Sequence, residues 1–476
     1  MARALLPVIA RQHWRLLVRD RRLTILGLAL LLALLTAGLG GAAMHASATA
    51  EHAAATSEEA RVWEMQGAAN PHGAAHFGRD VYKPVTPLAV LDPGLLPELG
   101  TALRLEAHAQ NPARDRAIDG GSAIDRFGGL TPAAMLQMLA PLLIILAGFA
   151  TFSGDGARTI LRQELSSGVS PALLMAGRLA GLAGAMLLPL AALALLAAAG
   201  LLLTGGGADA IGALLWMMLG YALYLWAFAA LTLAVSAAFG SARTSLVLLL
   251  AFWAAAVLLV PRIAPAVAEA AAPTLSGPVL EAAVTKEVLE GPSGHDPQDA
   301  RLARLREDTM RRYGVTKIED LAVDFGGISL FHGEALSTAI YRRYGAELYD
   351  GYDRQAGVQR GFALLSPLQA LRPLSAGLAQ SDQHAHRRFL EQADAYRYAL
   401  VQKLNRDIIH NRKDPDNPYL ADVGAITRDQ QFVPRAVPLG ETLQRHRADL
   451  MLLAVWAIIA SLLALAASRR LRRLAA

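Results

Sequence analysis

Six long apolar segments dominate this chain and restrict what it can fold into. They are Thr24–Met44, Thr131–Phe152, Leu173–Leu203, Ala210–Val235, Ser245–Pro261 and Leu450–Ala467. An α-helix needs roughly 20 mostly apolar residues to cross the hydrocarbon core of a bilayer. Most of the segments meet that length, and the fifth is the shortest. The sequence therefore predicts an all-α polytopic membrane protein with six transmembrane helices.

Two long polar inserts carry most of the water-exposed mass. Residues 45–130 follow the first span, and residues 262–449 follow the fifth. A chain of 476 residues that is 54% hydrophobic fits a polytopic protein with a substantial soluble part. Residue spacing predicts a mainly helical second insert with irregular segments. The elements expected there are helices at Asp299–Tyr313, Ala335–Tyr349 and Gln383–Ile409, the last capped by Ser381 or Asp382, and a short strand at Gln431–Val433.

The arginines indicate which side of the membrane the inserts occupy. They cluster in short stretches: residues 1–23, the loop at 153–172, the connection between spans four and five, and the tail at 468–476. Short loops rich in Arg or Lys stay in the cytoplasm, whereas long domains cross largely regardless of charge. Because six is an even number of spans, we expect both termini in the cytoplasm and both inserts outside it. Arg262 is a single exception.

The first 23 residues have two interpretations. Arg11, Arg15, Arg19 and Arg22 recur at helical spacing and predict an amphipathic helix in the membrane interface, with its arginines toward lipid phosphates. The alternative is a basic flank that only orients the first span. A cleaved signal peptide ending near Ala46–Ala48 is disfavoured, because the apolar run is about twice the ~7–15 residues of such a core.

The loop at residues 153–172 is expected to contain a short amphipathic helix. Leu161 and Leu165 fall on one face beside the Arg158 and Arg162 pair, and Gly168 ends the helix before the Ser170-Pro171 break. A short helix on the cytoplasmic side is a means by which a soluble motor subunit can push on a membrane subunit.

This loop resembles the corresponding loop in the permease subunits of type-2 ABC transporters. The matching positions are Asp155, Leu161-Arg162-Gln163, Ser166-Ser167-Gly168-Val169-Ser170 and Gly177-Arg178. The chain departs from that pattern at Ala157 and at Thr159-Ile160. Short motifs in the inserts are similar to those of one branch of these permeases, which has large extracytoplasmic domains of unknown function. They include Asn70-Pro71-His72, Leu91-Asp92-Pro93-Gly94, Ser366-Pro367 and Tyr396-Arg397.

The resemblance implies a dimeric permease in the bacterial cytoplasmic membrane, with periplasmic inserts and a separate ABC ATPase subunit. ATP and Mg²⁺ would then be bound by that partner, and the chain itself would need no cofactor. The sequence agrees, because none of its five lysines follows a glycine as a Walker A motif requires. The ATPase-coupling residues that the resemblance implies are Asp155, Arg158, Leu161, Arg162, Glu164, Leu165 and Gly168.

Three functions remain open at this stage. The first is a permease, not catalytic in itself, that exports a hydrophobic or envelope-related molecule as a homodimer or paired with a sister permease. The second is a machine that translocates nothing and transmits ATP-driven motion to its outer inserts and a periplasmic partner. The third, a membrane-anchored sensor or hydrolase, is disfavoured because the sequence has no nucleophile–base pair. No basic patch interleaved with aromatics points to nucleic acid.

Histidines raise the question of a metal site. His72 and His76 have the i, i+4 spacing of a helical pair, but Asn70-Pro71 and Gly73 argue against a continuous helix there. The chain has no cysteine and no zincin pattern. We therefore expect no metal, with His72 and His76 as weak candidates.

Overall fold

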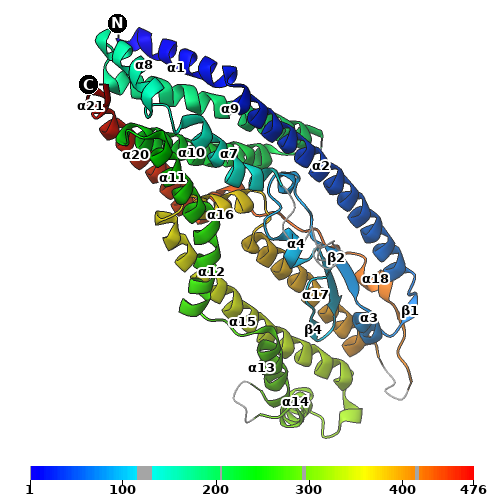
Figure 1. Ribbon diagram of the computed structural model, residues 1–476. Helices are drawn as coiled ribbons and strands as arrows, with labels where there is room; N and C mark the ends of the chain where they lie inside the picture. Colours follow the sequence, from blue (N-terminus) through cyan, green and yellow to red (C-terminus); the bar gives the residue numbers. More distant parts are fainter. Residues whose placement is uncertain (1, 115–130, 204–205, 292–295, 413–416, 476) are drawn as a thin grey trace.

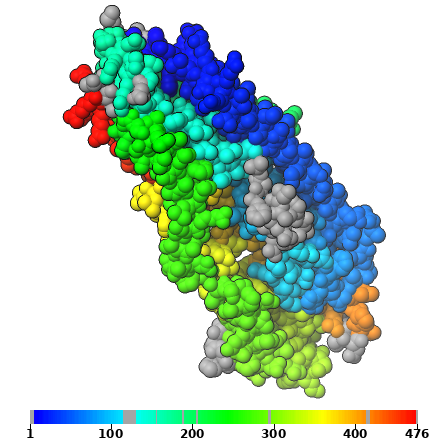
Figure 2. All heavy atoms as spheres, viewed as in Figure 1, coloured from blue at the N-terminus to red at the C-terminus, as the bar shows by residue number. Residues whose placement is uncertain are grey.

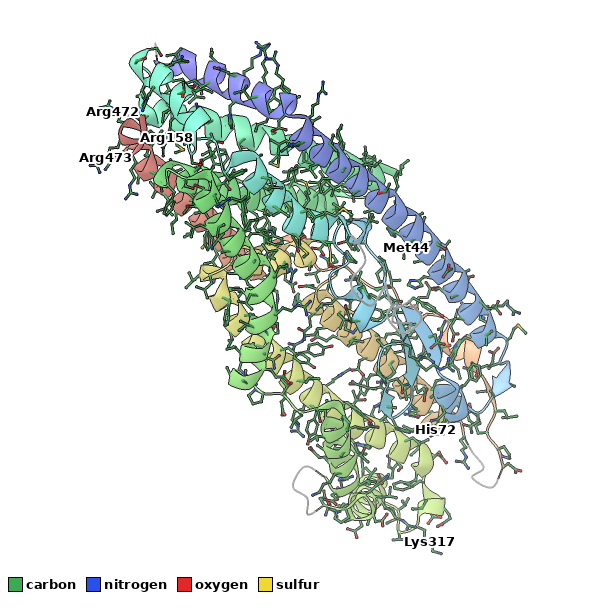
Figure 3. All side chains as sticks on the ribbon, in the orientation of Figure 1. Met44, His72, Arg158, Lys317, Arg472 and Arg473 are labelled. Atoms are coloured by element: carbon green, nitrogen blue, oxygen red, sulfur yellow. The ribbon has the colours of Figure 1, made fainter. Side chains whose placement is uncertain are left out.

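The computed structural model describes residues 2–114, 131–203, 206–291, 296–412 and 417–475. The chain is predominantly helical and elongated (Figure 1). The most apolar helices gather at one end together with both termini, which we call the membrane end, and most of the polar inserts form the opposite outer end. In Figure 3, Arg158, Arg472 and Arg473 lie at the membrane end, whereas His72 and Lys317 lie at the outer end.

Five helical runs are long and apolar enough to cross a membrane, which confirms the expectation of a helical membrane protein. They are α2 (Arg21–Glu64), α9 (Pro171–Leu203), α10 (Ala208–Ala238), the run Ala242–Ala271 and the run Arg447–Arg473. The fourth run consists of α11 (Ala242–Trp253), a π-helical segment η2 (Ala254–Leu259) and α12 (Val260–Ala271). The fifth contains α20 (Arg447–Ser468) and enters α21 (Leu471–Ala475). The fourth run continues ten residues beyond the expected end at Pro261.

The second expected span, Thr131–Phe152, forms the shorter helix α7 (Pro132–Gly148) of 17 residues. At a rise of 1.5 Å per residue it is about 26 Å long, slightly less than the ~30 Å hydrocarbon core. At its last residue, Gly148, the helix lies close to α10, since a Cβ there would lie 2.7 Å from Thr232 Cγ2. Among the described residues, five helices rather than six therefore reach the span length.

The N-terminal region is two helices and not one. α1 (Ala2–Arg19) stops at Asp20, whose extended backbone and side chain start α2: its carboxylate accepts hydrogen bonds from the backbone N–H of Arg22 and Leu23. Arg22 therefore lies on α2 and does not continue the basic stripe, which corrects the expected helix over residues 1–23. Arg11, Arg15 and Arg19 do lie exposed on α1.

α1 packs on α9 through closely spaced small residues. Ile9, His13 and Leu17 form its buried face. Gly177 and Gly181 of α9 permit the approach, because a Cβ at Gly181 would lie 2.6 Å from the carbonyl oxygen of Ala10. The buried face of α1 is thus covered by protein, while several other apolar side chains on α1 stay exposed.

α2 runs without interruption from the membrane end into the outer end. Its 44 residues extend 20 residues past Met44, where the first span was expected to end. Figure 3 places Met44 partway along this helix, and Figure 2 shows the N-terminal segment as one continuous ridge along the molecule. At the far end, the buried Trp63 donates from Nε1 to Thr427 Oγ1 at 2.8 Å. The first insert therefore begins as helix.

The two inserts supply the elements of the outer end. The first insert contributes β1 (Ala68–Ala69), α3 (Pro71–Phe77), β2 (Arg79–Tyr82), η1 (Pro87–Val90), α4 (Leu96–Leu99), β3 (Ala102–Glu106) and β4 (Ala109–Gln110). The second contributes α13 (Gly277–Glu290), α14 (Gln298–Tyr313), η3 (Ile318–Asp320), α15 (Phe325–Gly361), η4 (Phe362–Leu364), α16 (Leu368–Leu378), α17 (Gln383–Asn411), β5 (Ala421–Asp422), α18 (Val423–Thr427) and α19 (Leu439–Arg445).

These elements interleave into one packed unit. β2, β3 and β4 form an antiparallel sheet in that order, and β1 of the first insert pairs with β5 of the second. Two apolar clusters mix residues from both inserts. The first contains Trp63 and Leu404, and the second contains Leu105 and Phe389. The strand expected at Gln431–Val433 is wrong, because those residues are irregular, while Asp382 does cap α17 as expected.

Polar contacts join the outer unit to the membrane end. α16 packs against both α10 and α20. Tyr221 of α10 accepts from Gln137 Nε2 of α7 at 3.0 Å and lies 3.1 Å from Ser375 Oγ of α16. At the start of α20 the fully buried Asp449 binds Arg360 of α15 at 2.8 Å. Separating a buried polar pair costs much free energy, so these contacts hold the two ends together firmly.

Candidate functional site

A short helix at the tip of the membrane end is the first candidate site. α8 (Asp155–Ser166) follows α7 through a turn, and Gly168, with φ of +84°, ends it before α9 begins at Pro171. This confirms the short helix expected in the loop at 153–172. Both termini lie at the same end, and α21 contacts α8 (Figure 1).

Arg178 of α9 fixes α8 in place. Its Nη2 binds Glu164 Oε2 at 2.5 Å, and its Nη1 donates to the carbonyl oxygen of Thr151 at 2.8 Å. The guanidinium also stacks over Phe152, 4.6 Å from the ring centre. Because Arg178 is buried, these charge-assisted contacts are stronger than a surface ion pair.

The two faces of α8 differ in polarity and exposure. Leu161 is fully buried, Leu165 is partly buried, and Arg158 Nη2 donates to the carbonyl oxygen of Gly240 at 3.0 Å. The opposite face is exposed, and on it Ile160 is 50% exposed. Arg162 is also exposed. Asp155 begins the helix, and its side chain lies outside the described part of the structure.

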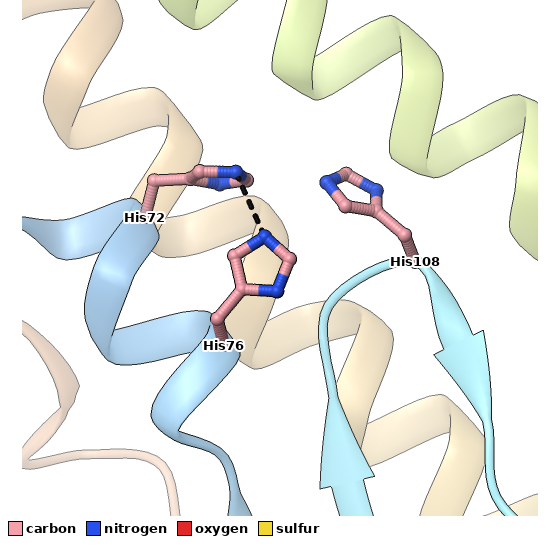
Figure 4. A group of neighbouring side chains, drawn as sticks. All are labelled: His72, His76 and His108. Carbon is pink, nitrogen blue, oxygen red and sulfur yellow. Dashed lines mark hydrogen bonds between the residues drawn. The ribbon is translucent and has the colours of Figure 1, made fainter.

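Three histidines at the outer end form the second candidate site. His72 and His76 lie on α3, and His108 lies in the turn between β3 and β4 (Figure 4). One ring nitrogen from each residue lies within 4.8 Å of those of the other two. The Nε2 atoms of His72 and His76 are 3.1 Å apart.

α3 is a regular helix, so the expected interruption there is wrong. Asn70 accepts from the backbone N–H of Gly73 at 2.9 Å, and Pro71 occupies the first helical turn, where its missing N–H costs nothing. His72 and His76 consequently project from the same face one turn apart. Nothing local in the sequence indicates His108 as the third member, because only the fold of the hairpin brings it near.

A buried carboxylate supports the third histidine. Glu334 of α15 accepts from the backbone N–H of His108 at 2.8 Å and lies 3.0 Å from its Nδ1. Burial alone would raise the pKa of Glu334, but hydrogen bonds from His108 and Arg397 and the charge of Arg397 outweigh it and lower the pKa to about 2. Glu334 is therefore ionised at neutral pH.

His72 is held in the neutral form. Burial, followed by the neighbouring His108 and His76, lowers its pKa to about 4, while Asn405 and Glu334 oppose that shift. A neutral imidazole keeps a lone pair on one ring nitrogen. Next to His72 is a pocket of about 360 Å³, also lined by Asn70, Ser329 and Leu330.

Acid sensitivity of the outer end should depend on a second buried histidine as well as on His72. His386 of α17 is buried beside Lys83, and burial, then the charge of Lys83, lowers its pKa to about 4. Below pH ~6.5 the unfolded chain binds a proton at this histidine that the folded chain does not bind. The free energy of unfolding therefore falls as the pH falls from 6.5 to 4. At pH 5 the loss is about 2 kcal/mol relative to pH 7.5.

Thermal unfolding of the full chain in detergent checks this at the two pH values. His386→Phe should show a smaller acid-induced drop in Tm than the wild type, whereas His410→Phe, at an exposed position on the same helix, should not. Equal acid-induced drops in wild type and His386→Phe would contradict the assignment.

One family model matches the chain. It describes a domain of unknown function, DUF3526, and covers residues 279–421, from α13 to the first residue of β5. Comparison with curated proteins gives no match. The matched region includes Glu334 and Arg397 but neither α8 nor the three histidines.

Proposed function

We propose that the chain is the permease-like membrane subunit of a type-2 ABC system, driven by a separate ATPase that docks on α8. The resemblance of the loop at 153–172 motivates this reading. The observation that carries it is the construction of α8: a short helix with a buried face, anchored to α9 by Arg178, and with an apolar residue, Ile160, left exposed.

α8 is suited to receive force. Its anchors lead toward the long helices, since Arg178 belongs to α9 and Arg158 bonds to Gly240, two residues beyond the end of α10. A push on the exposed face would therefore act on two candidate spans together. An exposed isoleucine at the centre of a small docking surface is the kind of residue that fills a pocket on a partner.

The same proposal gives the topology. α8 and the basic α1 and α21 lie at the cytoplasmic face of a bacterial inner membrane, and the outer end lies in the periplasm. α7 serves as a sixth, short span, and a second permease copy completes the assembly. ATP and Mg²⁺ belong to the ATPase, and export of a hydrophobic or envelope-related molecule is the activity proposed for the complex.

One observation favours a second candidate function, the transmission of motion without translocation. α2 connects α1 at the membrane end to Trp63 in the core of the outer end without a break. The buried contacts of α16 with α10 and α20 form a second connection. A machine that moves its outer unit against a periplasmic partner needs such connections.

Reconstitution tests the proposal. The full chain is placed in nanodiscs with a candidate ABC ATPase from the same organism, and ATP hydrolysis is measured with and without the chain. We expect a stable complex and a several-fold change in hydrolysis. An ATPase whose activity ignores the chain and that does not bind it would overturn the proposal. Vesicle uptake of a lipophilic probe then separates export from transmission of motion.

A further inference from the structure

We propose that His72, His76 and His108 form a binding site for one divalent transition-metal ion of the Zn²⁺ class, with a coordination position left for water or an external ligand. The site goes beyond the proposed ATP-driven function and does not depend on it. It lies at the outer end, at the opposite end of the molecule from α8 (Figure 1).

The spacing of the ring nitrogens fits such an ion. Zn–N bonds of 2.0–2.1 Å in a tetrahedron place the ligand nitrogens about 3.3 Å apart. The Nε2 atoms of His72 and His76 are already 3.1 Å apart, and the third ring lies within 4.8 Å of both. In Figure 4 the three rings converge on a common point between α3 and the hairpin turn. Small side-chain rotations close the remaining gap.

The partners of His108 fix which nitrogen it offers. Nδ1 faces Glu334 at 3.0 Å, so Nε2 is the nitrogen left for the cluster. Glu334 is itself held by Arg397 and by Thr338, whose Oγ1 donates to it at 3.0 Å. A carboxylate behind a metal-bound imidazole sets its tautomer and increases its basicity. The structure therefore contains a second shell as well as three ligands.

The backbone of His108 gives an independent reason to consider this position special. Its φ is +61°, and among the described non-glycine residues only Gln380 shares a positive φ. The left-handed region costs a residue with a side chain roughly 1–2 kcal/mol, and glycine adopts it without that cost. His108 adopts this strained conformation in a two-residue turn and directs its ring at two other histidines. A role of its imidazole as a ligand explains why histidine and not glycine occupies the position.

The ligand set selects the class of ion. Among the described residues the cluster offers three imidazole nitrogens and no carboxylate or thiolate, a set that suits Zn²⁺, Cu²⁺ or Ni²⁺ and does not suit Ca²⁺ or Mg²⁺. The chain has no cysteine that would favour softer ions. The exposed His76 and the pocket beside His72 give the ion a route of entry. Because Glu334 belongs to the second insert, the bound ion would also tie the two inserts together.

Zinc titration of the full chain tests the site. The protein in nanodiscs is stripped with EDTA and titrated with Zn²⁺ against a chromophoric chelator, and Co²⁺ substitution reports tetrahedral geometry through its visible bands. We expect one Zn²⁺ per chain. Since loss of a second-shell partner alone typically weakens binding by 10–100-fold, His72→Ala, His76→Ala and His108→Gly should each weaken it by about 100-fold or more. His410→Ala should bind like the wild type.

His108→Gly also separates loss of binding from misfolding. Glycine relieves the positive φ and keeps the backbone N–H that donates to Glu334, and this gain offsets part of the loss of the Nδ1 contact with Glu334. The apo variant should therefore still unfold in one cooperative transition, while Zn²⁺ no longer raises its Tm. Absence of Zn²⁺ binding by the wild type at micromolar concentrations would overturn the proposal. Stoichiometric binding that survives all three substitutions would overturn it as well.

Discussion

Replacing Arg397 by leucine should destabilise the outer end by about 3–5 kcal/mol, the largest effect expected of any single substitution there. Arg397 is buried on α17 and bonds to Glu334, to Thr338 Oγ1 at 2.7 Å and to Asp394 at 3.1 Å. Leucine would leave the fully buried Glu334 without its cation. The cost arises mainly from that uncompensated charge and less from the lost attraction itself.

Amide hydrogen exchange of the full chain in detergent measures this effect where it occurs. Peptides from α15 and α17 should exchange more than about 100-fold faster in Arg397→Leu. Arg388→Leu is the matched control, because Arg388 lies on the same helix with its side chain 45% exposed, and its removal should change stability by no more than about 0.5 kcal/mol. The double variant Arg397→Leu/Glu334→Leu should recover part of the loss. Exchange in Arg397→Leu at the wild-type rate would show that the network contributes little.

If the proposed ATPase docks on α8, Ile160→Asp should uncouple the chain from it. If Ile160 is the apolar centre of the docking surface on α8, a carboxylate there costs at least 2 kcal/mol of binding, or about 30-fold in affinity. The fold of α8 should persist, since Leu161 and the Arg178–Glu164 pair hold its other face. The readout is ATPase binding and the chain-dependent change in ATP hydrolysis in nanodiscs.

The control for this substitution lies at the other end of the molecule. Val433 is an exposed apolar residue in the second insert, so Val433→Asp makes the same chemical change far from α8. It should leave ATPase binding unchanged. Wild-type coupling in Ile160→Asp would place the docking surface elsewhere and count against the role assigned to α8.

Capping and terminating residues in the sequence predicted several helix ends correctly. Gly168 and Pro171 bound α8, Asp382 caps α17, and Gly314 ends α14, each as expected from its residue type. The expected break at Asn70-Pro71 was wrong, because these residues begin a helix as readily as they interrupt one. Asp20 acts in the same way, since its capping side chain divides the basic N-terminal stripe.

The ends of the membrane helices and the composition of the sites were not predictable in the same way. The hydropathy around Met44 does not show that α2 continues as a polar helix. The far half of α2 is stabilised by packing of Trp63 against α17 and α18, which lie far away in the sequence. His108 and Glu334 lie 226 residues apart in the sequence and meet only in the folded outer end. Contacts at such separations carry no periodic signal.

The unbroken length of α2 has a geometric consequence. A helix of 44 residues is about 66 Å long, of which the hydrocarbon core accounts for roughly half. If such a rod pivots near Asp20, a change in tilt of about 5° moves its far end by about 6 Å, more than the rise of one helical turn. Changes in tilt that are too small to disrupt the packing of α2 beside α9 would thus displace its far end, at Trp63, by about the size of a side chain.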